Sequence, residues 1–227
     1  MLSLANPHQE KRSPQYPAPS PFFRSTVASA YRNPNNNRNE TEREGGMSVD
    51  VTATIRVATA EDAERVSELA ARTFRETFAA DNSAEDMAAY LAATFTPVRQ
   101  RRELEDPGQR VLLLELDAVS VGYAQLTRST PDAAVTGEAP VELARFYVDG
   151  AWHGRGLAQQ LMRAVVDEAV QIGARTLWLG VWERNPRAIA FYRKHAFVDV
   201  GSHPFVLGCD VQTDRVMQRS IGASADD

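Results

Sequence analysis

The spacing of apolar and polar residues from position 52 onward predicts strands interleaved with helices. Two apolar stretches, 111–116 and 120–127, are separated by only a few residues and predict a hairpin, and 141–148 predicts a further strand. Between 157 and 172 apolar residues recur close to every 3.6 positions, which predicts an amphipathic helix ended by Gly173. Further strands are predicted at 52–57, 176–181, 198–200 and 214–218, and further helices from Thr59, from Ser83 and at 186–195.

These elements follow one another in the order β-α-α-β-β-β-α-β-α-β-β. Such an order predicts one α/β domain of the mixed, α+β kind, which we place at residues 47–220, with a flexible tail at 221–227. The helix that Ser83 caps is predicted to run through Leu91, with Pro97 beyond its end.

The first 46 residues differ from the rest of the chain. They hold six of the 12 prolines and an Asn-rich run at 33–39, and no apolar periodicity passes through them. A segment of this kind buries too little apolar surface to offset the entropy of ordering, so we predict a disordered leader at 1–46. The Glu and Gly residues just before Met47 have purine-rich codons, as a translated ribosome-binding site would. Met47 as the true start is therefore an equally open interpretation.

Composition excludes several classes of function. The net charge is −5, which argues against nucleic acid as a partner. A single cysteine, Cys209, and four scattered histidines exclude a disulfide framework and give no metal-ligand spacing, so we expect no metal. No stretch approaches the roughly 18 apolar residues that span a bilayer. We therefore expect a cytoplasmic protein without a membrane partner.

The run Gly154-Arg155-Gly156-Leu157-Ala158 joins a predicted strand to a predicted helix. The glycines let the backbone turn tightly and approach a ligand, and the free N–H groups that open the helix favour an anion such as a pyrophosphate. The glycines alone are equally typical of an ordinary strand-to-helix turn. The run is neither a Rossmann fingerprint nor a P-loop, because it lacks the third glycine of the first and the Gly-Lys-Ser/Thr of the second.

Residues 141–162 as a whole resemble the acetyl-CoA motif of the GNAT superfamily of N-acetyltransferases, which reads Gln/Arg-x-x-Gly-x-Gly/Ala after a strand. Gly156 and Ala158 match this motif, whereas His153 stands where the family has Gln or Arg. A second family signature, Asn-x-x-Ala-x-x-Phe-Tyr-x-Lys-x-Gly-Phe, is matched at 185–197, with Ala196 in place of Gly.

The resemblance implies a GNAT-like fold and a way of binding acetyl-CoA. The central sheet would be mixed, mostly antiparallel and splayed between the fourth and fifth strands, with helices on both faces. Acetyl-CoA would lie in the splay as the co-substrate. The residues that the resemblance places around it are Phe146, Tyr147, Val148, His153, Gly154, Arg155, Gly156, Leu157, Ala158, Asn185, Ala188, Phe191 and Lys194.

The resemblance also suggests roles in the reaction. The N–H of Val148 would stabilise the oxyanion, Glu142 would take the proton of the amine or hold the ammonium, and Tyr192 would protonate the leaving thiolate. Ordinary interpretations stand beside these: Glu142 as a strand-edge surface residue, Tyr192 as a core tyrosine, Asn185 as a helix cap, and Arg155 and Lys194 as solvated charges.

A finer resemblance concerns the acceptor. Residues 203–217 and 73–90 are similar to segments of the PaiA-type spermidine/spermine acetyltransferases, which implies a small primary amine, with a polyamine first. The implied acceptor residues are Phe74, Glu76, Phe78 and Tyr90, which are equally ordinary as core aromatics and a surface acid. A protein N-terminus, an amino sugar or an antibiotic amine stay open as acceptors, as does a non-catalytic acyl-CoA sensor. Related enzymes are often dimers, so a homodimer stays open as an interpretation, but nothing in the sequence indicates a dimer interface.

Overall fold

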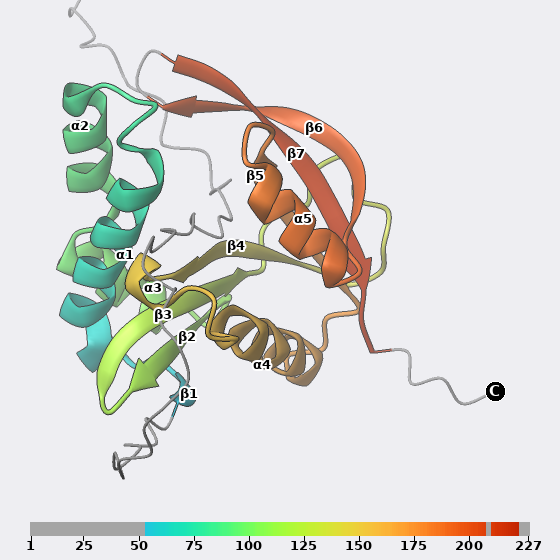
Figure 1. Ribbon diagram of the computed structural model, residues 1–227. Coiled ribbons are helices and arrows are strands. Elements are labelled where there is room, and N and C mark those ends of the chain that lie inside the picture. Colours follow the sequence, from blue (N-terminus) through green and yellow to red (C-terminus); the bar gives the residue numbers. More distant parts are fainter. Residues whose placement is uncertain (1–52, 208–209, 223–227) are drawn as a thin grey trace, which may run out of the picture.

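The computed structural model describes residues 53–207 and 210–222 (Figure 1). The leader at 1–46, the alternative start at Met47, Cys209 and most of the tail at 221–227 lie outside the described residues. The elements are β1 (Ala53–Val57), η1 (Ala60–Asp62), α1 (Ala63–Phe78), α2 (Ala84–Thr94), α3 (Pro97–Glu105), β2 (Gln109–Leu116), β3 (Val119–Thr127), β4 (Pro140–Val148), η2 (Gly150–Trp152), α4 (Leu157–Gln171), β5 (Thr176–Trp182), α5 (Pro186–Lys194), β6 (Val198–Leu207) and β7 (Asp210–Ser220).

The strands form one sheet in the order β1-β2-β3-β4-β5-β7-β6. Every neighbouring pair is antiparallel except β4 and β5. These two are parallel because α4 carries the chain back across the sheet between them, as a parallel pair requires. The predicted fold class, a mixed and mostly antiparallel sheet, is confirmed.

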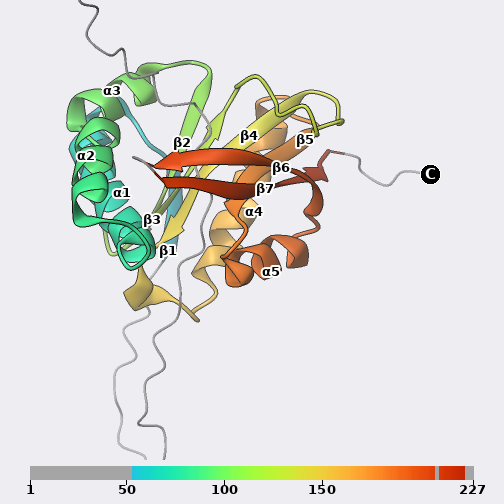
Figure 2. The ribbon, with the colours of Figure 1, turned by 90° about the horizontal axis from the view of Figure 1, so that it is seen from above.

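Each face of the sheet has its own apolar core. One core joins α4 and α5 to residues such as Leu143, Phe146 and Leu179. The other joins α1 and α2 to residues such as Leu113 and Tyr147. Figure 2 shows α1, α2 and α3 gathered on one side of the strands, with α4 and α5 away from them. Helices on both faces, as predicted, therefore leave the sheet buried on both sides.

Strands β4 and β5 pair only where they begin. Their register holds Pro140 against Thr176, Val141 against Leu177 and Glu142 against Trp178, and no further residue of β4 pairs with β5. In Figure 1 β4 and the β6–β7 pair diverge from this end like the arms of a V. The predicted splay is therefore present, and Glu142 marks the point at which it opens.

The structure differs from the predicted elements in two places. Pro97 lies beyond the end of α2, as predicted, but it also begins a helix, α3, that the sequence analysis did not predict. The Thr96 side chain accepts a hydrogen bond from the N–H of Arg99, and proline at the first helical position has no N–H to lose. The closing strands β6 and β7 are also much longer than the predicted 198–200 and 214–218.

Candidate active site

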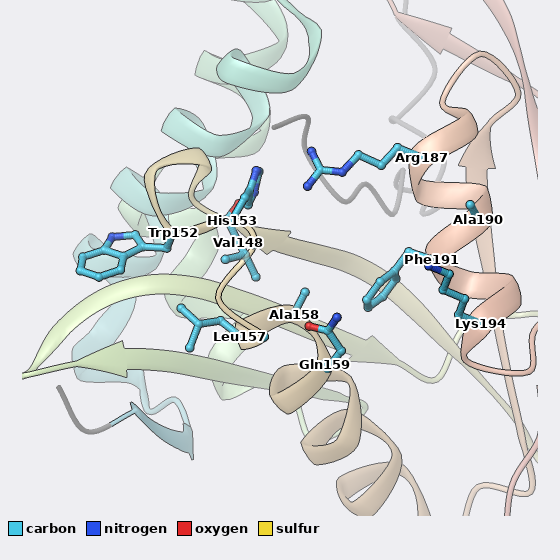
Figure 3. A pocket seen from close by; sticks show the side chains of 12 residues that line it. Val148, Trp152, His153, Leu157, Ala158, Gln159, Arg187, Ala190, Phe191 and Lys194 are labelled. Carbon is cyan, nitrogen blue, oxygen red and sulfur yellow. The ribbon is translucent and has the colours of Figure 1, made fainter. Parts of the chain in front are cut away.

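A cavity of about 300 Å³ lies between the N-terminal end of α4 and the helix α5 (Figure 3). Its α4 side contains eight lining residues, and α5 supplies the other four. They are Val148, Trp152, His153, Gly154, Gly156, Leu157, Ala158 and Gln159 on the first side, and Arg187, Ala190, Phe191 and Lys194 on the second. Eight of the predicted cofactor residues thus line one cavity.

The loop before α4 takes a shape that needs glycine. Gly154 and Gly156 both have φ of +78°, a conformation that residues with a Cβ rarely adopt. A Cβ at either position would meet nothing within 4 Å, so the loop leaves open space in front of the helix. The first N–H groups of α4 have no partner within the helix and carry its positive dipole end. This arrangement fits an anion such as a diphosphate.

Arg187 extends from α5 into the same cavity, toward His153 on the opposite wall (Figure 3). Its Nη1 atom is buried without a hydrogen-bond partner among the residues that the structure describes. Burial also lowers the pKa of this guanidinium. A half-buried guanidinium with one buried, unsatisfied nitrogen fits a phosphate group, which would supply both charge and acceptors. The sequence analysis missed Arg187, although it stands inside the signature at 185–197.

His153, which stands where the family motif has Gln or Arg, fastens the loop before α4 to the end of β4. Its Nε2 donates to the carbonyl oxygen of Val148 at 2.7 Å, which fixes the loop to the end of β4. The N–H of Asp149 donates to the carbonyl oxygen of Val121 on β3. Because backbone N–H and C=O groups alternate in direction along a strand, those of Tyr147 also face β3. The N–H groups of Phe146 and Val148 then point to the edge from which β5 has diverged.

The remaining predicted cofactor residues lie outside the cavity lining. The guanidinium of Arg155 stacks 4.8 Å from the ring centre of Trp152. The Asn185 side chain accepts from the N–H of Ala188 at 3.0 Å and so caps α5. Phe146 and Ala188 are buried in the α4–α5 core. The Tyr147 side chain belongs to the opposite face of the sheet.

Glu142 is buried, with a relative exposure of 1%. One carboxylate oxygen accepts a hydrogen bond of 2.6 Å from Ser129 of the β3–β4 loop, and the other, Oε1, has no partner among the described residues. Burial raises the pKa of this carboxyl to about 7, although the Ser129 hydrogen bond and the charge of Arg145 act in the opposite direction. A carboxyl with this pKa can accept a proton near neutral pH.

Arg145 lies on the same face of β4 as Glu142 because a bulge at Ala144 shifts the alternation. Leu143 pairs with Leu126 and Arg145 with Gln125, so Ala144 has no register partner. The Arg145 guanidinium is fully buried and donates to Glu103 of α3 at 2.7 Å. The helix that the sequence analysis missed therefore balances the charge beside Glu142.

Tyr192 is a residue of α5, and its side chain is completely buried. Its ring lies edge-on to Phe146, Phe191 and Phe197, with centroids 5.6 to 6.4 Å apart. Tyr147, on the other face of β4, has a pKa raised well above its usual range, mainly by burial and in smaller part by nearby tyrosines that include Tyr192. The two tyrosines are therefore within electrostatic range of each other.

The predicted acceptor residues separate into two places. Phe74, Phe78 and Tyr90 belong to the aromatic core on the α1–α2 side, with Phe74 in ring contact with both others at 4.5 and 4.7 Å. Glu76 is exposed and lies near the loop at Gly150, with Oε2 3.9 Å from where a Gly150 Cβ would be. The structure does not bring Glu76 together with the three aromatics.

The described residues contain neither a metal-ligand cluster nor a membrane-spanning helix. Within residues 53–207 and 210–222, no three side chains of His, Cys, Asp or Glu lie together in a way that could hold a metal ion. No helix in this part of the chain combines the length and apolar character needed to cross a membrane.

The family model described as the Acetyltransferase (GNAT) family matches residues 63–197, which is more than half of the chain. An uncharacterised N-acetyltransferase of Lactobacillus delbrueckii subsp. lactis is 33% identical over 149 residues, covering 66% of this chain and 86% of that protein. An uncharacterised N-acetyltransferase of Mycobacterium tuberculosis is 34% identical over 160 residues, covering 70% and 98%. The chain belongs to the GNAT family of acetyltransferases, which confirms the predicted enzyme class.

Solved structures show the same fold. The PaiA N-acetyltransferase from Thermoplasma acidophilum, solved with coenzyme A, superposes with a TM-score of 0.62 at 18% identity, covering 74% of this chain and 99% of that one. The acetyltransferase YncA from Salmonella typhimurium, solved with acetyl-CoA, gives a TM-score of 0.55 at 24% identity, covering 78% and 98%.

Proposed function

We propose that this acetyltransferase transfers the acetyl group of acetyl-CoA directly to a small primary amine. The observation that carries the proposal is the combination of a splayed β4–β5 pair, an anion cradle at one end of the splay and the buried carboxyl of Glu142 at the other. Acyl transfer to an amine needs both a held acyl donor and a proton acceptor, because an ammonium has no lone pair.

The cavity residues fit acetyl-CoA. The amides of Gly154–Ala158 and the guanidinium of Arg187, whose Nη1 has no partner among the described residues, would hold its diphosphate, and Lys194 supplies a second cation on α5. The outward backbone groups of Phe146 and Val148 would meet its pantetheine arm as an added strand does. Bound there, acetyl-CoA supplies the activated acetyl thioester.

Glu142 prepares the amine. With a pKa of about 7, its carboxylate is deprotonated in a large fraction of molecules near neutral pH and can take the proton, directly or through water. The unpartnered Oε1 is the atom available for this transfer, since Oε2 already accepts from Ser129. The same oxygen can first hold the ammonium.

Two further charges develop in the reaction, on the oxyanion and on the leaving thiolate. The backbone N–H of Val148 would stabilise the first, and Tyr192 would protonate the second. The N–H of Val148, directed to the open edge of β4, is a preorganised donor for an oxyanion. Tyr192 would give its hydroxyl proton to the departing thiolate, because an unperturbed tyrosine, with a pKa near 10, is protonated at neutral pH. The interpretation of Tyr192 as a core side chain alone stays the competing one.

For the acceptor we propose a polyamine, as in the PaiA-type enzymes. The likeness of the fold to a PaiA structure and the similarity at 203–217 support this choice. A protein N-terminus, an amino sugar or an antibiotic amine are the alternative acceptors. The cytoplasmic location expected from the sequence stays a prediction, and a homodimer stays an open interpretation.

The test is an acceptor screen. Release of coenzyme A from acetyl-CoA would be followed with spermidine, putrescine, a peptide N-terminus, glucosamine and an aminoglycoside, against a blank without amine. Turnover with a polyamine well above the other acceptors is the expected result. Binding of acetyl-CoA with no turnover on any amine would instead favour the sensor.

A further inference from the structure

The two oxygens of the buried Glu142 carboxyl have different surroundings. Oε2 accepts a hydrogen bond of 2.6 Å from the Ser129 hydroxyl, whereas Oε1 has no partner among the described residues. The last torsion of a glutamate side chain is broad, so a hydrogen bond to one oxygen is what fixes the plane of the carboxyl. The Ser129 contact therefore decides which oxygen is left for another group.

Ser129 lies in the β3–β4 loop, and the chain holds this loop on both sides of the residue. Just before it, the N–H of Arg128 donates to the carbonyl oxygen of Gly108 at 2.9 Å. Three residues after it, Asp132 pairs with His203 of β6, with Oδ2 and Nδ1 3.1 Å apart. The backbone at Ser129 is thus held from two directions.

The rest of the loop is fixed against β7 and β5. The N–H of Thr136 donates to Gln218 Oε1 at 3.1 Å. A Cβ at Gly137 would overlap the side chain of Thr176, so only glycine lets the loop lie this close to β5. These contacts keep the Ser129 hydroxyl in place, and a reacting side chain is well oriented only when the groups that support it are rigid.

Other charged and titratable groups share this face of the sheet with Glu142. Among the described residues they are Arg145 and Tyr147 of β4, Tyr123 of β3, Tyr90 of α2, Glu103 of α3, Asp132 of the loop, and His203 and Asp214 beside Gly180 of β5. Burial raises the pKa of Glu142, and the Ser129 hydrogen bond and the charge of Arg145 lower it. Ser129 is therefore the neutral group through which the carboxyl can be altered while the charges stay in place.

We propose that Ser129 is a positioning residue of the transfer reaction, which holds Oε2 of Glu142 so that Oε1 is presented to the acceptor amine. This inference rests on the proposed function, because it takes Glu142 to be the base. A hydroxyl donor favours the charged carboxylate, so Ser129 also favours the form of Glu142 that can accept a proton. Without this contact, Glu142 would be protonated in a larger fraction of molecules and less firmly oriented.

The experiment is the pH dependence of kcat/KM for spermidine, at saturating acetyl-CoA, in wild type and in Ser129→Ala. Loss of the hydroxyl raises the pKa of Glu142, so the rise in activity should move to higher pH by roughly one to two pH units. At pH ~6, below both midpoints, this shift is a loss of about 10–100-fold.

Two conservative variants keep the test usable if Ser129→Ala fails to fold. Ser129→Thr retains the hydroxyl, so its midpoint should stay within about 0.3 pH unit of wild type. Ser129→Cys has nearly the same shape and a weaker donor, so its midpoint should move upward by less than that of the alanine variant.

Ser120→Ala is the matched control. Ser120 also donates to a buried carboxylate, Glu115 Oε1 at 3.3 Å, but it lies at the other end of β3. Its profile should be that of wild type. An unchanged midpoint in Ser129→Ala would overturn the inference, and so would activity lowered equally at every pH, as a merely structural defect would lower it.

Carbon-13 NMR of protein labelled at glutamate separates this result from failure of the proposed function, because it needs no turnover. The Glu142 signal is the one that Glu142→Gln removes. If no amine is acetylated, the proposed function is wrong, whereas a Glu142 midpoint that Ser129→Ala moves upward still supports the hold of Ser129 on the carboxyl. A midpoint that does not move refutes the inference in either case.

Discussion

Glu142→Gln separates the charge of this side chain from its shape. Glutamine has nearly the same size and keeps an oxygen that can accept the hydrogen bond from Ser129. It cannot take a proton, so we expect kcat to fall by about 10²–10⁴-fold. Affinity for coenzyme A should stay within about twofold of wild type, because Glu142 is not among the residues that line the cavity.

The same variant tests the buried charge through protein stability. Burial raises the pKa of Glu142 from 4.5 to about 7, so the folded protein keeps this proton over a range in which the unfolded chain has released it. Stability therefore falls as pH rises through this range, by ~1.4 kcal/mol for each pH unit. The whole interval amounts to about 3 kcal/mol. Glutamine does not titrate, so the variant should gain about 3 kcal/mol over wild type between pH ~5 and pH ~8.

The assay is urea unfolding of both proteins at these two pH values, together with kcat/KM as a function of pH. Wild-type activity should rise through pH ~7 as Glu142 loses its proton, and the variant should lack this rise. Glu138→Gln, an exposed position in the same loop as Ser129, is the matched control. Identical pH profiles and parallel stability curves for Glu142→Gln and wild type would show that the base lies elsewhere.

Three further substitutions test the rest of the site. Tyr192→Phe should lower kcat by about 10–10⁴-fold with coenzyme A affinity nearly intact; an unchanged kcat would remove Tyr192 from proton donation. Arg187→Gln should weaken coenzyme A binding about tenfold or more in calorimetry, whereas the exposed Arg184→Gln should not, and equal losses would contradict a specific phosphate contact. Ala196→Gly should stabilise the protein by about 1 kcal/mol in urea unfolding, because Ala196 has φ of +62°; no gain would show that this conformation is unstrained.

The sequence predicted one helix and two left-handed backbone positions that the structure confirms. The apolar residues that recur at 157–172 form α4, because they lie on one face of the helix and pack against the sheet. The family signature places a glycine where Ala196 stands, and the structure confirms a left-handed residue there. Gly173 likewise has φ of +83°, as the predicted end of the helix requires.

The missed elements depend on context that a local pattern does not contain. Proline both follows helices and begins them, so Pro97 alone cannot indicate which helix end it marks. Gly201 and Pro204 are unfavourable in strands, so the sequence predicted only the first part of β6. Proline is tolerated at this position because β6 is an edge strand of the sheet.

The surroundings of the site residues likewise depend on tertiary contacts that a local sequence pattern does not contain. Glu142 is buried and accepts a hydrogen bond from Ser129 of the β3–β4 loop, and no spacing along the chain encodes either feature. Asn185 appeared as either a ligand contact or a cap, and the structure shows it capping α5. Nothing in the sequence distinguishes Arg187 from the other arginines, and only the fold shows that its side chain lines the cavity.

The most direct test is calorimetry with acetyl-CoA and with S-acetylpantetheine, which lacks the diphosphate. We expect one acetyl-CoA to bind per chain, and the truncated thioester to bind at least about 100-fold more weakly, since the cradle at Gly154–Ala158 and Arg187 would lose its anion. No heat with acetyl-CoA, or equal affinity for the two thioesters, would contradict it.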